Sequence, residues 1–174
     1  YYQQNDLDYE NYTSLGPGHP ASGSSWGAEG LLLSGDGSQE TTSWAAFGEL
    51  HYSFTDATRL TLGARYSDEE KDFDLRPIGV PEEGRVDLSD SWDETTYRLG
   101  LDHVRGDDML AYFTYSTGFK SGGFNEQATS PATAALSFDP ELADSFELGL
   151  KTDLLDDTMR LNVALFYVEY EDLQ

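Results

Sequence analysis

The strongest constraint on the fold of this chain is an alternation of apolar and other side chains with a period of two residues. In the run 43–54, apolar residues such as Trp44, Leu50 and Tyr52 occupy even positions, and the odd positions are mixed or polar. The run 59–66 repeats the pattern after a short polar stretch. Because side chains alternate between the faces of a β-strand, these two runs predict an antiparallel hairpin. Two further pairs of runs, 96–102 with 110–117 and 145–151 with 160–167, predict two more hairpins.

The connections between these runs alternate between short and long. Short polar turns are centred near residues 56, 106 and 155, and long stretches rich in Gly and Asp lie near 72–90 and 118–140. In an antiparallel meander, this alternation places all short turns at one end of the sheet and all long loops at the other. We therefore divide the chain into two parts: residues 1–40, the end of an upstream strand with a long outer loop, and residues 41–174, three hairpins.

Strand length and loop length together favour a transmembrane β-barrel. Loops of about 20 residues are unusual in compact soluble domains, whereas such barrels combine short periplasmic turns with long extracellular loops. The predicted strands, about 10 to 14 residues long, can cross a bilayer when tilted. Aromatic residues near the predicted strand ends suit the interfacial girdles of a barrel. They are Trp44, Tyr52, Phe54, Tyr66, Trp92, Tyr115 and Tyr170.

The predicted fold class is therefore all-β, an antiparallel up-and-down meander that forms part of a transmembrane β-barrel. Closed single-chain barrels begin at eight strands, and the sequence predicts about six. An open sheet in lipid would leave backbone groups unpaired at its edges. We therefore expect these strands to belong to a larger barrel.

Composition and motifs exclude several kinds of function. With 33 acidic against 10 basic residues, the chain lacks the basic patch that nucleic-acid binding needs. It has no Cys, and His19, His51 and His103 are too far apart in sequence to suggest a metal site. No Ser lies in a nucleophile elbow. We predict no catalytic residue, no metal site and no cofactor, and therefore no enzyme.

Two motifs have a structural and a ligand-binding interpretation. The Gly-rich stretch 121–125 lacks the Lys-Ser/Thr ending of a phosphate loop, so its glycines are expected to bend the chain where a strand enters a loop. The acidic stretch 68–74 lacks the Gly turn and terminal Glu of a Ca²⁺ loop. We interpret it as a solvated strip of an outer loop, with divalent ions bridging it to lipopolysaccharide as the alternative.

Charged residues of both signs fall on the inward positions of the predicted strands. One register of the first hairpin, with residue 55 facing 59, would put Glu49 opposite Arg65. Such charges can pair with one another, which is the interpretation we favour, or they can contact a polar or anionic ligand in the lumen. The inward candidates for ligand binding are Glu49, Arg65, Arg98 and Glu147.

Several longer motifs stand out along the predicted hairpins. The third hairpin carries SFELGLK at 145–151 and RLNVALFY at 160–167, followed by YEDLQ at 170–174. Upstream lie YSTGFKSGGFN at 115–125 and LGARYS at 62–67. These runs resemble stretches of the barrels of a known family, the TonB-dependent outer-membrane receptors. The resemblance covers roughly residues 41 to 174, with the motifs in the family's order.

The resemblance implies a fold, partners and a function. The family has a 22-stranded barrel in the outer membrane of Gram-negative bacteria, plugged by a globular domain that engages TonB. Its members take up bulky nutrients such as ferric siderophores. The implied partners are outer-membrane lipid and lipopolysaccharide, a nutrient ligand, and TonB through a plug domain that these residues do not include. Two alternatives stay open: a passive porin-like barrel, and a soluble β-sandwich carbohydrate-binding module, whose long loops should not all fall at one end.

Overall fold

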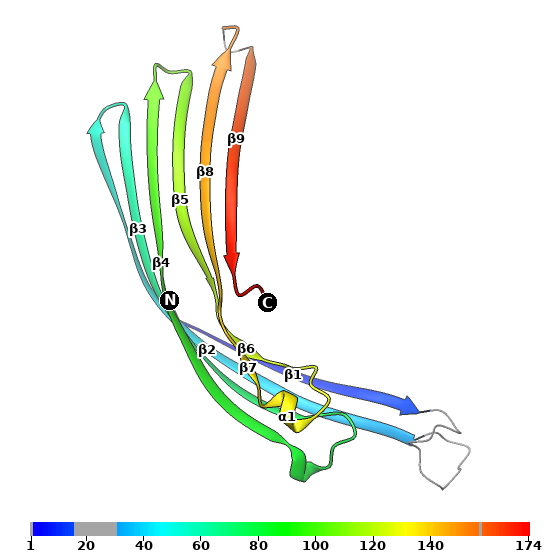
Figure 1. Cartoon of the computed structure of the whole chain (residues 1–174). Helices are drawn as coiled ribbons and strands as arrows, with labels where there is room; N and C mark the ends of the chain where they lie inside the picture. The colour runs from blue at the N-terminus through cyan, green and yellow to red at the C-terminus, as the bar shows by residue number, and fades with distance from the viewer. Residues whose placement is uncertain (1, 16–30, 157) are drawn as a thin grey trace.

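The chain forms one curved antiparallel sheet of seven strands, with the strands ordered along the sheet as they occur in the chain (Figure 1). The computed structural model describes residues 2–15, 31–156 and 158–174, and the side chains of 2–8 and from residue 35 onward. The sheet is open between its two edge strands, so these residues make a section of barrel wall. The strands are β1 (Tyr2–Leu15), β2 (Leu31–Thr55), β3 (Thr58–Arg76), β4 (Val86–Arg105), β5 (Met109–Lys120), β8 (Glu141–Leu154) and β9 (Met159–Glu171).

The short and long connections lie at opposite ends of the sheet, as the sequence predicts (Figure 1). The three short turns fall between Thr55 and Thr58, Arg105 and Met109, and Leu154 and Met159. At the other end, the 3₁₀-helix η2 (Glu82–Gly84) links β3 to β4. The segment between β5 and β8 forms the two-residue strands β6 (Gly123–Phe124) and β7 (Ser137–Phe138) and the helix α1 (Pro131–Ala134). This arrangement argues against the soluble sandwich.

The strands extend further toward the long loops than the sequence predicts. Within residues 1–40, β1 continues to Leu15 and β2 begins at Leu31, and the rest of the expected outer loop lies outside the described residues. The expected loop 72–90 shrinks to nine residues, 77–85, because β3 and β4 run into it from both sides. The strands continue here with charged side chains in place of apolar ones, so hydrophobicity does not mark where they end.

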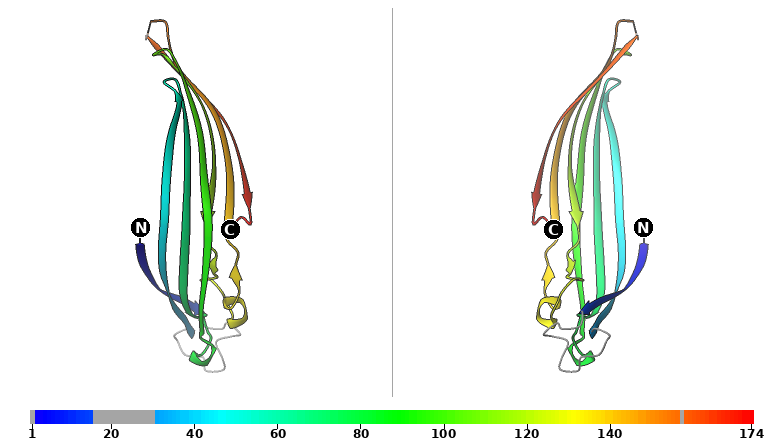
Figure 2. Two further views of the ribbon diagram at one scale, coloured as in Figure 1. Left: turned by 90° about the vertical axis from the view of Figure 1, so that its left-hand side faces the viewer. Right: turned by 90° about the vertical axis from the view of Figure 1, so that its right-hand side faces the viewer.

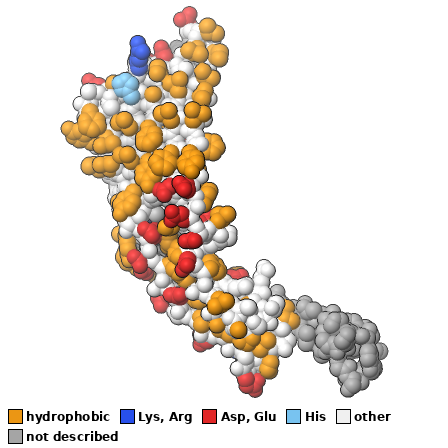
Figure 3. Space-filling view, in the orientation of Figure 1, with side chains coloured by type: hydrophobic (Ala, Val, Ile, Leu, Met, Phe, Trp, Pro, Cys, Tyr) orange, Lys and Arg blue, Asp and Glu red, His pale blue; other side chains and the backbone are white. Residues whose placement is uncertain are grey.

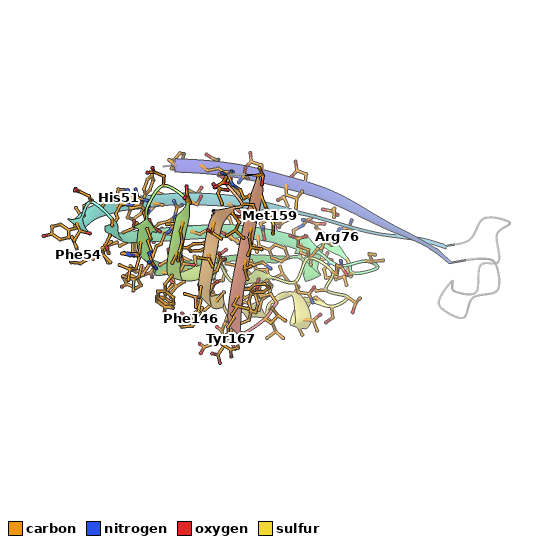
Figure 4. The ribbon with its side chains drawn as sticks, turned by 90° about the horizontal axis from the view of Figure 1, so that it is seen from above. His51, Phe54, Arg76, Phe146, Met159 and Tyr167 are labelled. Carbon is orange, nitrogen blue, oxygen red and sulfur yellow. The ribbon has the colours of Figure 1, made fainter. Side chains whose placement is uncertain are left out.

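The two faces of the sheet differ in chemistry. Even positions of β2 and β3 point outward, and the register carries this face across to odd positions of β4 and β5. Figure 4 shows Phe146 and Tyr167 on one side of the sheet and His51 on the other. Large apolar side chains gather on the outward face, including Leu50, Leu62, Leu101, Leu148 and Leu165.

Seen edge-on, the sheet is curved and the ends of the chain lie at its two edges (Figure 2).

An aromatic belt crosses the outward face on the long-loop side of this apolar band. Its ring pairs are Trp44 with Tyr66, at 5.2 Å between centroids, and Tyr115 with Phe146, at 4.8 Å. Beyond the belt, the outward face carries a stripe of acidic side chains (Figure 3). They include Asp68, Asp93, Asp144 and Glu169, which occupy outward positions of four strands.

Two of the residues expected in the girdles lie elsewhere. Trp92 occupies an inward position of β4, opposite Glu69, and its ring meets Phe124 edge-on at 5.9 Å. Tyr170 also faces inward, from the end of β9 opposite Ala143. The prediction was wrong because it used distance from a strand end and ignored parity. The acidic stretch 68–74 likewise lies within β3, so its residues alternate between the two faces.

The buried core lies at the long-loop end, on the inward face. Phe73 and Leu75 of β3 are 1% and 3% exposed. Phe124 stacks on Phe73 at 5.1 Å, and Ala134 of α1 is fully buried in the same cluster. The segment 121–140 therefore folds back onto the inward face of β3 and β4. Among the described residues, no helix is long and apolar enough to cross a membrane.

Candidate functional site on the inward face

Three of the four predicted site residues gather on the inward face of β2, β3 and β4. Gly63 stands between Glu49 on one side and Arg98 on the other. A Cβ at Gly63 would lie 3.4 Å from the Cβ of Arg98 and 3.5 Å from an Oε of Glu49, so both side chains crowd the space above this glycine. Together with Arg65 they line a hollow of about 320 Å³.

The predicted pairing of Glu49 with Arg65 is wrong. Thr55 faces Thr58, so the turn contains only two residues, and the register shifts by one further residue between Ser53 and Thr55. The Thr55 hydroxyl accepts hydrogen bonds from the backbone N–H groups of Ala57 and Thr58, which fixes this tight turn. Glu49 consequently faces Gly63, and Arg65 faces Phe47.

Each of the two residues has a different partner. A carboxylate oxygen of Glu49 lies 3.0 Å from Nε2 of His51 on the same strand. Arg65 donates from Nε to the Ser67 hydroxyl at 3.0 Å, and its guanidinium lies 5.7 Å from the centroid of the Phe47 ring. The Glu49 carboxylate is therefore already paired with His51. Most of the N–H donors of the Arg65 guanidinium remain available to a ligand.

The fourth candidate, Glu147, lies apart from this group on β8. It faces Thr114 of β5 and accepts a hydrogen bond of 2.5 Å from the Tyr112 hydroxyl. The Tyr112 ring lies over Gly149, where a Cβ would overlap it, and 5.6 Å from the Lys151 ammonium. Glu147 therefore holds an aromatic side chain against the wall.

A second hollow of about 630 Å³ lies nearer the long loops, where the segment 121–140 meets the inward face of β2 and β3. Three basic side chains line it, Arg65, Lys71 and Lys120, in a chain whose formal net charge is −23. Arg65 also lines the first hollow, so the two spaces adjoin along β3. Two acidic residues, Glu69 and Glu126, are also among the residues that line it.

The folded-back segment is anchored through Lys71. The Lys71 ammonium donates to the Gly122 carbonyl at 2.8 Å, lies 3.3 Å from a carboxylate oxygen of Glu69, and lies 5.6 Å from the centroid of the Trp92 ring. The Ser121 hydroxyl donates to the same Glu69 carboxylate. The glycines at 122 and 123 therefore allow close packing on a wall, as well as bending the chain.

Sequence reasoning missed Lys71 and Lys120 because the hollow forms only when the segment 121–140 folds back, which brings Gly122 to Lys71 across 51 residues of sequence. A usable signal was the alternation itself, which continues through Lys71 and Phe73 with inward parity. Among the residues that the structure describes, neither Arg98 nor Lys120 has an ion-pair partner. No group of three or more metal-ligating side chains forms there either.

An ion-pair network ties the long-loop ends of β2, β3 and β4 together. Asp36 accepts from Arg76 Nε at 2.8 Å and from Arg85 Nη2 at 2.5 Å, and Arg85 also contacts Asp74 and Glu82. The hydrogen bond from Arg85 holds the pKa of Asp36 below its usual range. The hydrogen bond to Glu82, reinforced by Asp36, raises the pKa of Arg85 further above its ordinary value. The network fixes the strand extensions that frame the larger hollow.

Comparison with solved structures shows the same wall in other proteins. The chain is similar to the ferric yersiniabactin uptake receptor FyuA from Yersinia pestis, with a TM-score of 0.72 and 23% identity over 84% of this chain and 22% of that one. It is similar to the siderophore receptor PiuA from Acinetobacter baumannii, with a TM-score of 0.63 and 19% identity over 95% of this chain and 27% of that one.

A third similar structure is the alcaligin outer-membrane receptor FauA from Bordetella pertussis, with a TM-score of 0.57 and 17% identity. The match covers 99% of this chain and 30% of that one, so the chain spans less than a third of each of these proteins. The family model for the TonB-dependent receptor-like β-barrel matches residues 1–174. The chain therefore belongs to the TonB-dependent receptor family and forms a section of its β-barrel.

Proposed function

We propose that the chain is the wall section of an outer-membrane receptor that takes up an iron–siderophore complex in a Gram-negative bacterium. The similar structures are receptors for different siderophores, among them yersiniabactin and alcaligin. Because these receptors take different siderophores, the comparison supports siderophores as the class of ligand and does not identify one compound. The proposed function is transport without covalent chemistry. TonB would supply the energy through a plug domain in another part of the protein.

The observation that carries this proposal is the gathering of unpaired cations on the inward face of a strongly acidic chain. Arg65 lines both hollows. Arg98 lines the smaller hollow, and Lys120 lines the larger hollow nearer the long loops. An anionic iron chelate would exchange water for these charged donors in succession as it moves inward. Charge-assisted hydrogen bonds of this kind are about twice as strong as neutral ones.

We assign ligand contact to Arg65, Arg98 and Lys120, and positioning roles to Glu49 and Glu147. Each of these acids already has a neighbour, His51 or Tyr112, and would repel an anionic ligand. The outward apolar band would face outer-membrane lipid, and its loop-side edge would face lipopolysaccharide.

The test uses the full-length receptor in a host that lacks its own siderophore receptors. Growth under iron limitation is measured with a panel of ferric siderophores, with TonB present and absent. Growth that requires both the receptor and TonB supports the proposal. Growth or solute entry that is independent of TonB would instead favour the passive porin.

Arg65→Ala should reduce uptake about tenfold, because a hydrogen bond to a charged group contributes about 1.5–3 kcal/mol. The matched control is Arg59→Ala on the same strand and face. Arg59 already pairs with Asp102, at 2.7 Å, near the short-turn end. Equal effects of the two substitutions would remove Arg65 from the ligand path.

A further inference from the structure

A groove on the outward face of the sheet is not explained by the inward site. It has a volume of about 550 Å³, crosses β2, β3 and β4, and reaches β5. Gly48 and Ala64, which face each other across β2 and β3, form its floor. Its walls are formed by Leu50, Leu62, Tyr97, Leu99 and Tyr115.

The groove exists because two small residues stand opposite each other among large ones. A Cβ added at Gly48 would find no atom within 4 Å, so the space above this glycine is open. On the next pair along the strands, Leu50 faces Leu62 and both side chains project outward, 62% and 43% exposed. Tyr97 of β4 faces Ala64 and borders the other side, 54% exposed.

The open edges of the sheet do not create this groove. The four strands that line it, β2 to β5, are neighbours within the sheet, with β1 on one side and β8 on the other. Closing the barrel would add strands beyond β1 and β9 and would leave the groove on the outside.

We propose that the groove between Gly48 and Ala64 seats an acyl chain of lipopolysaccharide. It is continuous with the apolar band on the outward face, where a barrel of this family contacts lipid. It is lined mainly by apolar side chains and is open to its surroundings, which suits a flexible hydrocarbon chain, and the Tyr115 hydroxyl at its edge already donates to Asp144. The inference rests on the proposed outer-membrane location and is independent of which ligand the receptor carries.

Its depth in the membrane selects lipopolysaccharide over phospholipid. The groove lies directly beneath the aromatic belt on the long-loop side, since Ala64 is two residues from Tyr66 on the same face. In barrels of this type the long loops are extracellular. The hydrocarbon at that level belongs to the outer leaflet, which lipopolysaccharide fills. Asp68 and Asp93, outward and facing each other beyond the belt, would repel the lipid phosphates, so the acyl chain is the part recognised.

The test fills the groove by substitution and measures how many lipid molecules remain bound to each barrel. The full-length receptor is purified in mild detergent from a host that makes lipopolysaccharide, and native mass spectrometry counts the lipid molecules per barrel. Ala64→Leu and Gly48→Leu place a side chain in the open space. The control is Ala111→Leu, which enlarges another small outward residue on β5, outside the groove.

We expect lipopolysaccharide retention to fall at least fivefold in both groove variants and to match the wild type in the control. In a second measurement, lipopolysaccharide added to delipidated protein should raise the melting temperature of the wild type and the control only. Unchanged retention and an unchanged melting shift in the groove variants would overturn the proposal. So would a retained lipid that is phospholipid and is lost from the same variants.

Growth on ferric siderophores, measured on the same variants, separates this inference from the proposed function. A loss of lipid retention with normal uptake supports the groove alone. If no siderophore supports growth of the wild type while its lipid retention depends on the groove, the proposed ligand fails and the lipid site stands.

Discussion

The two halves of the sheet are built from the same strands and differ in what lies against them. In the half nearer the short turns, β3 points Leu60 and Leu62 outward and has only short side chains or charges on its inward face. In the half nearer the long loops, the same strand points Asp72 and Asp74 outward and buries Phe73 and Leu75 inward. The apolar side therefore changes from the outward to the inward face along one strand.

This change of face shows that the two halves depend on different surroundings. Leu50 and Leu165, 62% and 69% exposed on the described chain, are stabilised only when hydrocarbon covers them. Phe73 is covered by protein, through the folded-back segment 121–140. The loop-side half thus has a core of its own, and in the proposed outer-membrane location the bilayer would take the place of a core for the other half.

The largest expected effect is the loss of that core. Phe73→Ala removes a ring that is 1% exposed and stacks on Phe124. A large-to-small change in a core costs about 3–5 kcal/mol, which should release the segment 121–140 while the barrel stays folded. Limited proteolysis of the full-length receptor measures the release. Phe47→Ala, which changes an exposed ring outside the cluster, should leave the segment protected. Equal cleavage of both variants would contradict a separate loop-side core.

A charge on the outward face separates the two halves directly. Leu101→Arg places a guanidinium in the apolar band, where a barrel loses about 2–4 kcal/mol of stability at the bilayer midplane. Ser91→Arg, on the same strand and face beyond the aromatic belt, should change stability by less than about 1 kcal/mol. Unfolding titrations of the full-length protein in lipid vesicles compare them. A similar loss at both positions would mean that the bilayer does not end at the belt.

The two halves also differ in how much space surrounds a glycine. A Cβ at Gly122 would overlap the carbonyl oxygen of Phe138 and lie 2.5 Å from Nε1 of Trp92. Gly122→Ala should therefore cost about 1–3 kcal/mol by overpacking and loosen the segment 121–140. Gly48→Ala meets open space and should leave stability unchanged or slightly raised. Thermal unfolding and proteolysis of the two variants measure the contrast, and tolerance of Gly122→Ala would show that the close packing on Trp92 is dispensable.

The sequence predicted the half of the sheet in which apolar and polar residues alternate. The hairpins, the three turns near 56, 106 and 155, and the outward position of Trp44 and Tyr66 all follow from that period. It did not predict the ends of β3 and β4, because charged residues such as Glu70 and Asp72 continue a strand without an apolar signal.

The site was predicted less well than the fold. Parity placed Glu49, Arg65 and Arg98 correctly on one face, but the two-residue turn and the one-residue irregularity near Ser53 together changed which of them face each other. A bulge of this kind leaves no trace in an alternation pattern. Lys71 and Lys120 line the larger hollow only because the segment 121–140 folds back on the wall, a contact between segments that no local pattern encodes.

The smallest expected effect concerns the ion pairs that hold the strand extensions. Arg85 keeps the pKa of Asp36 below its ordinary value of 3.8, so the carboxylate contributes stability that is fully present above about pH 3.8. That contribution is lost as the pH falls through the lowered pKa of the folded protein. For a partly exposed pair it amounts to about 1 kcal/mol or less. Hydrogen exchange of the amides of residues 36–38 should therefore speed up beyond its intrinsic change as the pH falls below about 3.8, and not above that pH. Asp36→Asn should abolish this dependence while amides near Leu101 keep their protection, and a variant that still shows it would move the titration to another carboxylate.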